Sequence, residues 1–455
     1  MPPNEASAPG PATPAFAPTP RTVNVVLGMM LITMVINSVD RTILSILVQD
    51  IKLDLDLSDR QLGLLLGPAF TIFYTLATFP LAAWADMGRR RTVIAVGLFF
   101  WSLFTLGTAW AKGFWSLFAF RMLVGIGEAS SVAPGQSLLM AYVPVARRAR
   151  AMSMIAIGAV LGLAIGMMMG GYISEWRGWR MAFVIAGLPG LVFAFIFYFS
   201  VREAPQSEKG VPWREVRRTM FAIRTYRWVL AAQSMALFAS MGRNLWEPTF
   251  LRRVYEMGAG EAGTWYFLTS PLPSAFGIYF GGWLVDRLRR RDGRWMMWVP
   301  TFGQIVSLPF LLGFLMWPET SRLSMEPLDP VLRWLPFLRI DGGFPVALLF
   351  SIVGSVFGSF YAAPMLAVTQ TLAPVVMRAR AAALAGALSA VIGHGLGPTL
   401  VGELNERLAP QYGELAIRYS LVVVVIAALI SAFLWFGASR PLRGDLERRA
   451  ASGPE

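Results

Sequence analysis

Residues 144–151 read PVARRARA, and residues 374–381 of the same chain read PVVMRARA. A second pair of similar stretches precedes them in each half, with DMGRRR at residues 86–91 and DRLRRR at residues 286–291. All four stretches follow a long apolar run. Patterns that recur once in each half, in the same order, indicate that the chain contains two copies of one architectural unit.

The apolar runs between these motifs are long enough to cross a membrane. Of the 455 residues, 55% are hydrophobic and 15% are charged, whereas roughly a quarter of a soluble domain is charged. A hydrocarbon layer of about 30 Å requires about 20 consecutive apolar residues in a helix. We expect an all-α integral membrane protein with twelve membrane-spanning helices at 24–48, 61–85, 92–111, 115–142, 150–173, 180–201, 228–251, 263–285, 295–317, 344–372, 379–402 and 416–438.

The runs divide into two groups of six around a polar connection. Because the first residues are rich in Pro and Ala and hold few large apolar side chains, they are expected to be disordered. The connection alternates basic with aromatic residues, which is typical either of an amphipathic helix on the membrane face or of a solvated linker. The predicted organisation is a tail at 1–21, a bundle at 22–201, a linker at 202–227, a bundle at 228–438 and a tail at 439–455.

The formal net charge of +13 comes mainly from basic residues in the connecting loops. Lys and Arg on the side of the two termini outnumber those in the opposite loops by about two to one, which places both termini in the cytoplasm of a cell whose inner membrane holds the protein. Basic charge spread over such loops faces anionic lipid, so nucleic acid is not an expected partner. We expect a monomer.

The residue types argue against an enzyme. The chain has no cysteine and one histidine, which excludes disulfides, thiolate metal sites and cysteine nucleophiles. Catalytic residues, metal ions and cofactors are therefore not expected.

The repeated acidic and arginine-rich loops suggest a latch. An acid at the end of a helix can pair with an arginine or with the N-terminus of a neighbouring helix, making a contact that opens and closes at the inner face. Positive charge that only sets the topology is the alternative. The candidate latch residues are Asp86 and Arg90 in the first copy and Asp286, Arg287 and Arg290 in the second.

These loops resemble the G-x-x-x-D-R-x-x-R-R loop of the major facilitator superfamily. The second copy matches at Gly282, Asp286, Arg287 and Arg290, and the first departs at Ala82 and Met87. The resemblance implies a major facilitator fold of two pseudo-symmetric six-helix bundles around one cavity, lined by spans 1, 4, 7 and 10.

Four stretches between about residues 30 and 205 are similar to bacterial members of the Spinster family of lipid transporters. They are NSVDR at 37–41, RMLVGIGEAS at 121–130, GWR at 178–180 and VREAP at 201–205. This resemblance implies a substrate such as a lysophospholipid or a phosphorylated sphingoid-like base.

Ionisable side chains inside the predicted spans mark a candidate site, because each costs at least a few kcal/mol at membrane depth. Asp40 and Arg41 lie on span 1, and Arg121 and Glu128 lie on span 4. Arg121 and Glu128 are seven residues apart, so two helical turns bring both side chains to one face. The sequence allows either Arg41 with Glu128 or Asp40 with Arg121 as a pair across the helices.

These four residues have two interpretations. Asp40 and Glu128 can change protonation or partner during transport, while Arg41 and Arg121 hold an anionic headgroup or the carboxylates. The alternative is a static ion-pair network that joins span 1 to span 4.

Further candidate cavity residues lie in the second half. Arg243 and Glu247 are four residues apart and either satisfy each other or contact substrate. His394 lies in a glycine-rich helix break, where it can titrate near neutral pH or serve the structure. Tyr361 follows a stripe of serines on span 10.

The predicted function is secondary active transport of an amphipathic lipid-like substrate by alternating access, with protons as a candidate coupling ion. A facilitator for a small organic anion, such as a sugar acid, is the nearest alternative; a channel and an integral membrane enzyme are further ones. A lateral opening with an apolar lobe favours a lipid, whereas a closed polar pocket favours a small anion.

Overall fold

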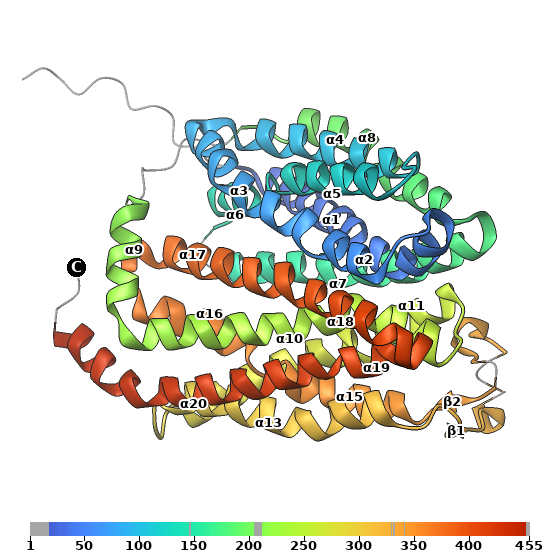
Figure 1. Ribbon diagram of the computed structural model, residues 1–455. Coiled ribbons are helices and arrows are strands. Elements are labelled where there is room, and N and C mark those ends of the chain that lie inside the picture. Colours follow the sequence, from blue (N-terminus) through green and yellow to red (C-terminus); the bar gives the residue numbers. More distant parts are fainter. Residues whose placement is uncertain are drawn as a thin grey trace, which may run out of the picture.

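The structure is a computed structural model that describes residues 18–144, 147–203, 212–328, 330, 333–340 and 342–451. The predicted N-terminal tail up to residue 17, residues 145–146 of the first repeated motif, linker residues 204–211 and the last four residues lie outside this part of the chain. Long helices run side by side in two bundles, with α9 (Trp213–Ala222) crossing between them (Figure 1).

The first bundle is built from broken and unbroken helices. Gly88 adopts φ 81° and allows the chain to reverse between the second and third spans. The elements are α1 (Pro20–Leu55), α2 (Asp59–Leu66), α3 (Pro68–Trp84), the π-helical segment η1 (Ala85–Arg89), α4 (Arg90–Thr108), α5 (Phe114–Glu128), α6 (Val132–Tyr142), α7 (Arg148–Arg177) and α8 (Trp179–Ser200).

The second bundle repeats this order and adds a small hairpin. Strands β1 (Arg322–Leu323) and β2 (Phe344–Pro345) pair antiparallel between the ninth and tenth spans, and β2 takes the first two residues of the span predicted at 344–372. The helices are α10 (Arg224–Val254), α11 (Ala259–Thr269), α12 (Pro271–Leu288), α13 (Trp295–Met316), α15 (Ala347–Gly358), α16 (Ala362–Leu372), α17 (Arg378–Ala390), the π-helical segment η6 (Val391–Leu396), α18 (Gly397–Tyr412), α19 (Ala416–Ser420) and α20 (Val422–Ala451).

Eight helical stretches in the described part of the chain are long and apolar enough to span a membrane. Two of them, 59–108 and 380–448, each hold two consecutive spans. The helices α10 and α12 are long enough but less apolar. With these two, the helices account for the twelve predicted spans, and α10 falls short because its interior carries polar and charged side chains.

The two ends of the molecule carry different elements. The linker end is the end at which α9 lies, and the hairpin end is the end at which β1 and β2 lie; they are opposite each other in Figure 1. α20 continues to the linker end, where the Asp445 carboxylate accepts hydrogen bonds from the backbone N–H and hydroxyl of Thr225 at 2.8 and 2.7 Å. The predicted C-terminal tail is thus helical as far as Ala451.

A stripe of glycines lets α7 pack closely on α1. A Cβ atom on Gly162 would lie 2.4 Å from the backbone oxygen of Val35, and one on Gly166 would lie 2.3 Å from Thr42 Oγ1. Real Cβ atoms do not come this close, so only glycine permits this backbone approach. The first half is therefore held together around the helix that carries Asp40 and Arg41.

Buried apolar side chains show where the two halves meet. One cluster contains residues from both halves, such as Leu47 of α1 and Phe250 of α10. Two separate clusters lie toward the linker end, one within the first half and one within the second. The halves therefore share a core from the hairpin end to about mid-depth and pack separately at the linker end.

Candidate functional site

Four ionisable side chains of the first half lie together in its interior. Asp40 and Arg41 come from the middle of α1, and Arg121 and Glu128 come from α5. Asp40, Arg121 and Glu128 are buried, whereas the Arg41 side chain remains 34% exposed. The structure thus brings together the four residues that the sequence marked.

Of the two pairings that the sequence allowed, the structure contains Arg41 with Glu128. Arg41 Nε donates to Glu128 Oε2 at 2.6 Å, and Asn37 Nδ2 donates to the same oxygen at 2.9 Å. Arg121 instead donates from Nη1 to the backbone oxygen of Asp40 at 3.5 Å. An ion pair therefore joins α1 to α5 at one carboxylate and not at the other.

Several polar atoms of this cluster have no hydrogen-bond partner among the described residues. These are both carboxylate oxygens of Asp40, Oε1 of Glu128, Nη2 of Arg41 and Nε of Arg121. Trp101 and Thr105 of α4 are the polar neighbours of Asp40, but neither reaches hydrogen-bond geometry with it. Buried polar groups are nearly always satisfied in folded proteins, so an unsatisfied group calls for an explanation.

An aromatic wall from α3 faces both arginines. The guanidinium carbons of Arg41 and Arg121 each lie 5.2 Å from the centre of the Phe70 ring, and that of Arg41 lies 4.8 Å from the Tyr74 ring. Such contacts are attractive because the ring face is electronegative. The sequence analysis did not identify Phe70 and Tyr74 as site residues, nor Asn37 as a hydrogen-bond donor to Glu128. The four-residue spacing of Phe70 and Tyr74, which places both rings on one face of a helix, could have indicated the aromatic wall.

The second half holds a separate charged network. Arg243 donates from Nε and Nη2 to the two carboxylate oxygens of Glu247, at 2.9 and 3.2 Å. Ser351 of α15 accepts from Arg243 Nη2 at 2.7 Å and donates to Glu247 Oε1 at 3.0 Å. Glu247 is fully buried. The two residues satisfy each other, as one of the two sequence interpretations proposed.

A cavity of about 290 Å³ lies beside this network. Its polar lining includes Asn244, Gln304, Ser355 and Tyr361 of the second half, and Arg243 reaches it from α10. Ser355 Oγ is buried without a hydrogen-bond partner in the described structure. The cavity can therefore hold a small molecule that carries hydrogen-bonding groups.

One side of the cavity is a seam between the halves, formed by Leu163 of α7 and Ile278 of α12. On the hairpin side α7 packs against α11, whereas α12 packs against α13, α15 and α16 of its own half. The seam is therefore closed toward the hairpin end and parts toward the linker end.

His394 lies in η6, where the second half contacts α3. A Cβ atom on Gly67 would lie 2.9 Å from the His394 backbone oxygen, so the two segments approach closely. His394 Nδ1 has no hydrogen-bond partner in the described part of the chain. Unlike the other candidates, His394 lies between the two halves.

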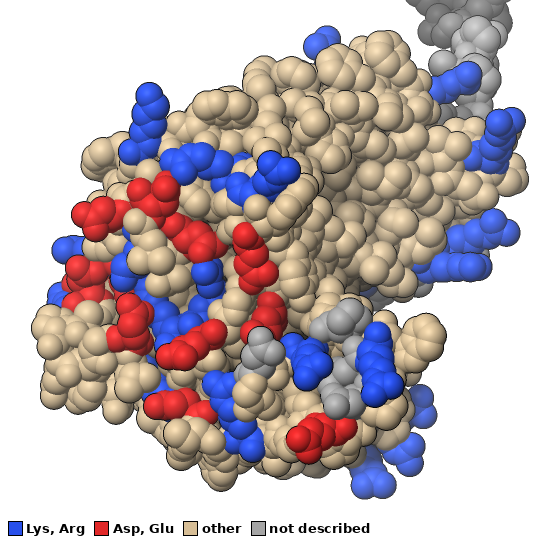
Figure 2. Space-filling view, turned by 90° about the vertical axis from the view of Figure 1, so that its right-hand side faces the viewer, with Lys and Arg blue, Asp and Glu red and all other residues tan. Residues whose placement is uncertain are grey.

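Ion pairs at the hairpin end join the two halves. Asp59 of α2 accepts two hydrogen bonds from Arg253 of α10, both at 2.7 Å, and Arg60 lies 2.9 Å from Glu403 of α18. Figure 2 shows acidic and basic side chains interspersed over this face. These residues lie near the ends of the predicted spans. From the sequence, the charges there indicated only the orientation of the chain in the membrane, and these ion pairs were not predicted.

The candidate latch residues lie at the opposite end, and no ion pair described for them joins the halves. Asp86 is exposed and has no ion pair within the described residues, whereas Arg90 is buried. Asp286 pairs with Arg289 on its own helix at 3.2 Å. Arg287 stacks on Trp283 at 5.6 Å, and Arg290 is exposed. The latch stays a prediction, because its closure would require the halves to approach at the linker end.

Comparison with known proteins places this geometry in a family. The family model of the Major Facilitator Superfamily matches residues 30–325. An "MFS-type efflux pump" of Mycolicibacterium smegmatis is 30% identical over 95% of this chain and 96% of its own length. A "D-galactonate transporter" of Escherichia coli O6:H1 is 25% identical over 58% of this chain and 67% of its own.

The fold also matches a solved structure. A bacterial homologue of the human lysosomal transporter Spinster, crystallised in an inward-facing and unoccupied conformation, superposes with a TM-score of 0.80. It is 24% identical and covers 94% of this chain and 99% of its own, which shows a shared fold. This match agrees with the resemblance found in the sequence, and the predicted twelve-helix facilitator fold is confirmed. The chain is a multi-pass membrane transporter, not an enzyme, and belongs to the Major Facilitator Superfamily.

Proposed function

We propose that the protein is a secondary active transporter that moves an amphipathic, lipid-like substrate by alternating access, with protons as the coupling ion. The single observation that carries the proposal is the buried cluster of Asp40, Arg41, Arg121 and Glu128. The cluster lies at mid-depth. The two halves share a core between this depth and the hairpin end, and they pack separately between this depth and the linker end.

The linker end is proposed to face the cytoplasm of a cell whose inner membrane holds the protein, as the excess of Lys and Arg on this side favours. The hairpin end then faces outward, and its ion pairs between Asp59 and Arg253 and between Arg60 and Glu403 form the closed outer gate. The conformation is accordingly inward-facing, with both termini in the cytoplasm. We propose a monomer, since one chain contains both halves.

The seam between α7 and α12 supports a lipid-like substrate. Its apolar side chains, Leu163 and Ile278, border a cavity that also holds polar groups. An amphiphile fits this arrangement if its headgroup occupies the polar cavity while its chain stays between α7 and α12. The Spinster resemblance of residues 37–41 and 121–130 supports the same substrate class.

The unpartnered atoms support proton coupling. An ionised carboxylate without a partner is unfavourable in a dry interior, so Asp40 gains from binding a proton when its surroundings close. The Arg41 side chain pairs with the buried Glu128 and is itself partly exposed. An anionic substrate could therefore attract Arg41 and break its ion pair with Glu128. Substrate capture and proton exchange are thereby coupled through one arginine.

Reconstitution into liposomes tests the proposal. Uptake of a panel of lysophospholipids is measured with and without an imposed pH difference, for the wild type, Glu128→Gln, Arg41→Ala and the control Glu447→Gln. Glu447 is exposed and pairs with Arg443 on its own helix, so this control removes a carboxylate far from the cluster. We expect pH-dependent uptake by the wild type and the control only. Glu128→Gln with intact transport and intact pH dependence would disprove the proton role.

A small organic anion is the second candidate substrate. The cavity volume of about 290 Å³ and its polar lining favour it, and one relative is named as a transporter of D-galactonate. The same liposomes loaded with sugar acids distinguish the two. Uptake of galactonate without uptake of any lysophospholipid would replace the lipid proposal and leave the coupling proposal in place.

A further inference from the structure

The helix α9 has two chemically different faces. Val216 and Met220 are fully buried in the core of the second half, and they lie four residues apart on one face of the helix. Arg214, Arg217 and Arg218 are exposed and share another face. The apolar face fixes α9 to the bundle, so the basic face is held in a defined place.

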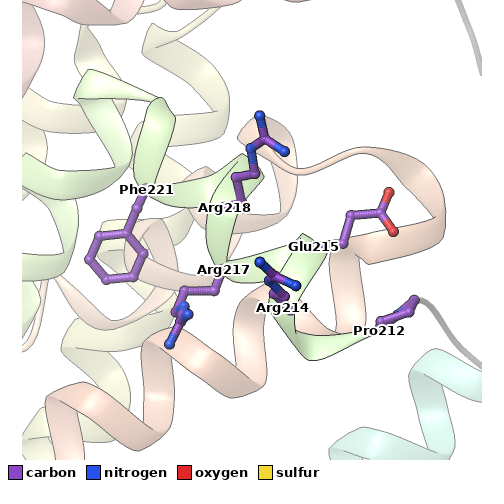
Figure 3. Close-up of a pocket in the computed structure, with 6 residues that line it drawn as sticks. All are labelled: Pro212, Arg214, Glu215, Arg217, Arg218 and Phe221. Carbon is purple, nitrogen blue, oxygen red and sulfur yellow. The ribbon is translucent and has the colours of Figure 1, made fainter.

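The basic face borders an open hollow of about 840 Å³ at the linker end. Its lining consists of Pro212, Arg214, Glu215, Arg217, Arg218 and Phe221, and Figure 3 shows these side chains spreading away from the helix. None of the three arginines forms an ion pair within the residues that the structure describes. The hollow thus holds three arginines, one carboxylate and one exposed aromatic ring, and its net charge is positive.

The surroundings of α9 match those of a membrane surface. The helix crosses the ends of the membrane-spanning helices in Figure 1, so it lies where they leave the bilayer. Phe221 and the nearby Trp228 of α10 are 37% and 42% exposed, and Arg224 and Arg227 extend the basic surface. Aromatic rings beside basic side chains are typical of helices that rest among lipid headgroups.

We propose that the basic face of α9 is a docking surface for the headgroups of anionic phospholipids in the leaflet at the linker end. Charge complementarity selects this occupant, because three arginines outnumber the one carboxylate of the hollow, Glu215, and the phosphate of an anionic headgroup balances the remaining positive charge. The exposed rings select a lipid over a dissolved anion, since they gain from contact with the acyl boundary.

The position of α9 is connected to both halves through Trp213. Its ring packs edge-on against Phe79 of α3, with 5.4 Å between the ring centres. The Arg380 guanidinium carbon of α17 lies 5.2 Å from the centre of the same ring. Lipid that holds α9 in place therefore acts on the contact between α3 and α17, at the end where the two halves part.

Direct lipid binding tests the docking surface without measuring transport, so its failure is distinct from failure of the proposed function. Purified protein in phosphatidylcholine nanodiscs is titrated with phosphatidylglycerol, and retained lipid is counted by native mass spectrometry. We expect a preference for phosphatidylglycerol that falls about fivefold for each arginine removed in the series up to R214Q/R217Q/R218Q. An unchanged preference in the triple variant would overturn the proposal.

Two matched variants complete the test. R214K/R217K/R218K keeps the charge and should keep the preference, which also shows whether substitution on α9 disturbs folding. R289Q/R407Q/R443Q removes three arginines that are each paired with an acid three or four residues away, and it should bind lipid like the wild type. Equal displacement of the lipid by dissolved glycerol phosphate would overturn membrane docking in favour of a soluble anion.

Discussion

The two halves bury arginine and carboxylate side chains in contrasting ways. In the second half, Arg243 and Glu247 lie on one helix, and Ser351 closes a network that satisfies both carboxylate oxygens. In the first half, the pair of Arg41 and Glu128 joins two helices, while the Asp40 carboxylate lies beside it without a hydrogen-bond partner in the described structure.

This contrast indicates that the second-half network has a structural role, whereas the first-half cluster can change its protonation or its partners. A buried pair with all its hydrogen bonds made is costly to break, because each partner would be left charged in a dry place. A carboxylate without hydrogen bonds, such as that of Asp40, breaks no ion pair or hydrogen bond when it takes up a proton. The pseudo-symmetric fold thus places charge in both halves, and we infer that only the first half uses it for coupling.

Removing one partner from the second half should give the largest effect on stability. Glu247→Leu leaves Arg243 buried and uncompensated, so we expect the free energy of unfolding to fall by about 3–5 kcal/mol. Denaturant unfolding in detergent micelles measures this change. The double variant Arg243→Met/Glu247→Leu removes both charges and should recover most of the loss; a double variant as unstable as the single one would contradict the structural role.

The matching change in the first half should leave stability almost unchanged and affect transport. Asp40→Asn mimics the protonated carboxyl and breaks no described hydrogen bond, so we expect the free energy of unfolding to stay within about 1 kcal/mol of the wild type. Accumulation driven by a pH difference should fall at least tenfold, which corresponds to about 1.4 kcal/mol. If Asp40→Asn unfolded the protein as readily as Glu247→Leu does, the static ion-pair interpretation would be correct instead.

Much of this arrangement could be predicted from the sequence. The two repeated motifs and the spacing of apolar runs predict two six-helix bundles, and α10 was recognised as a span although its polar residues lower its hydropathy. The rule that buried charge is rare drew attention to Asp40, Arg41, Arg121 and Glu128. Seven-residue spacing placed two of them on one face, because helix geometry is fixed locally.

The choice of partners could not be predicted, because it depends on how three helices rotate against one another. Arg41 reaches Glu128 because α1 and α5 pack with Asn37 toward the same carboxylate, and the Phe70 ring of α3 contacts both arginines. The ion pairs that join the halves at the hairpin end could not be predicted for a different reason. Asp59 and Arg253 are far apart in sequence, and each looks like an ordinary loop charge until the halves meet.

The aromatic faces provide the finest test of the contrast. Phe70 lies 5.2 Å from both arginines of the first half, and Phe314 lies 5.4 Å from Arg243 in the second. Replacing Phe70 by leucine removes two cation–π contacts and replacing Phe314 removes one, each worth about 1 kcal/mol, and both replacements remove a similar amount of buried apolar surface. Phe314→Leu is therefore a matched control for Phe70→Leu.

We expect Phe70→Leu to lower the initial rate of transport about fivefold, because Arg41 and Arg121 lose the surface that orients them toward substrate. Phe314→Leu should leave this rate unchanged, since Arg243 is already held by Glu247 and Ser351. Initial rates in liposomes, normalised to the amount of folded protein, make the comparison. Equal losses in both variants would mean that the second-half network also handles substrate, and the division of labour between the halves would then have to be abandoned.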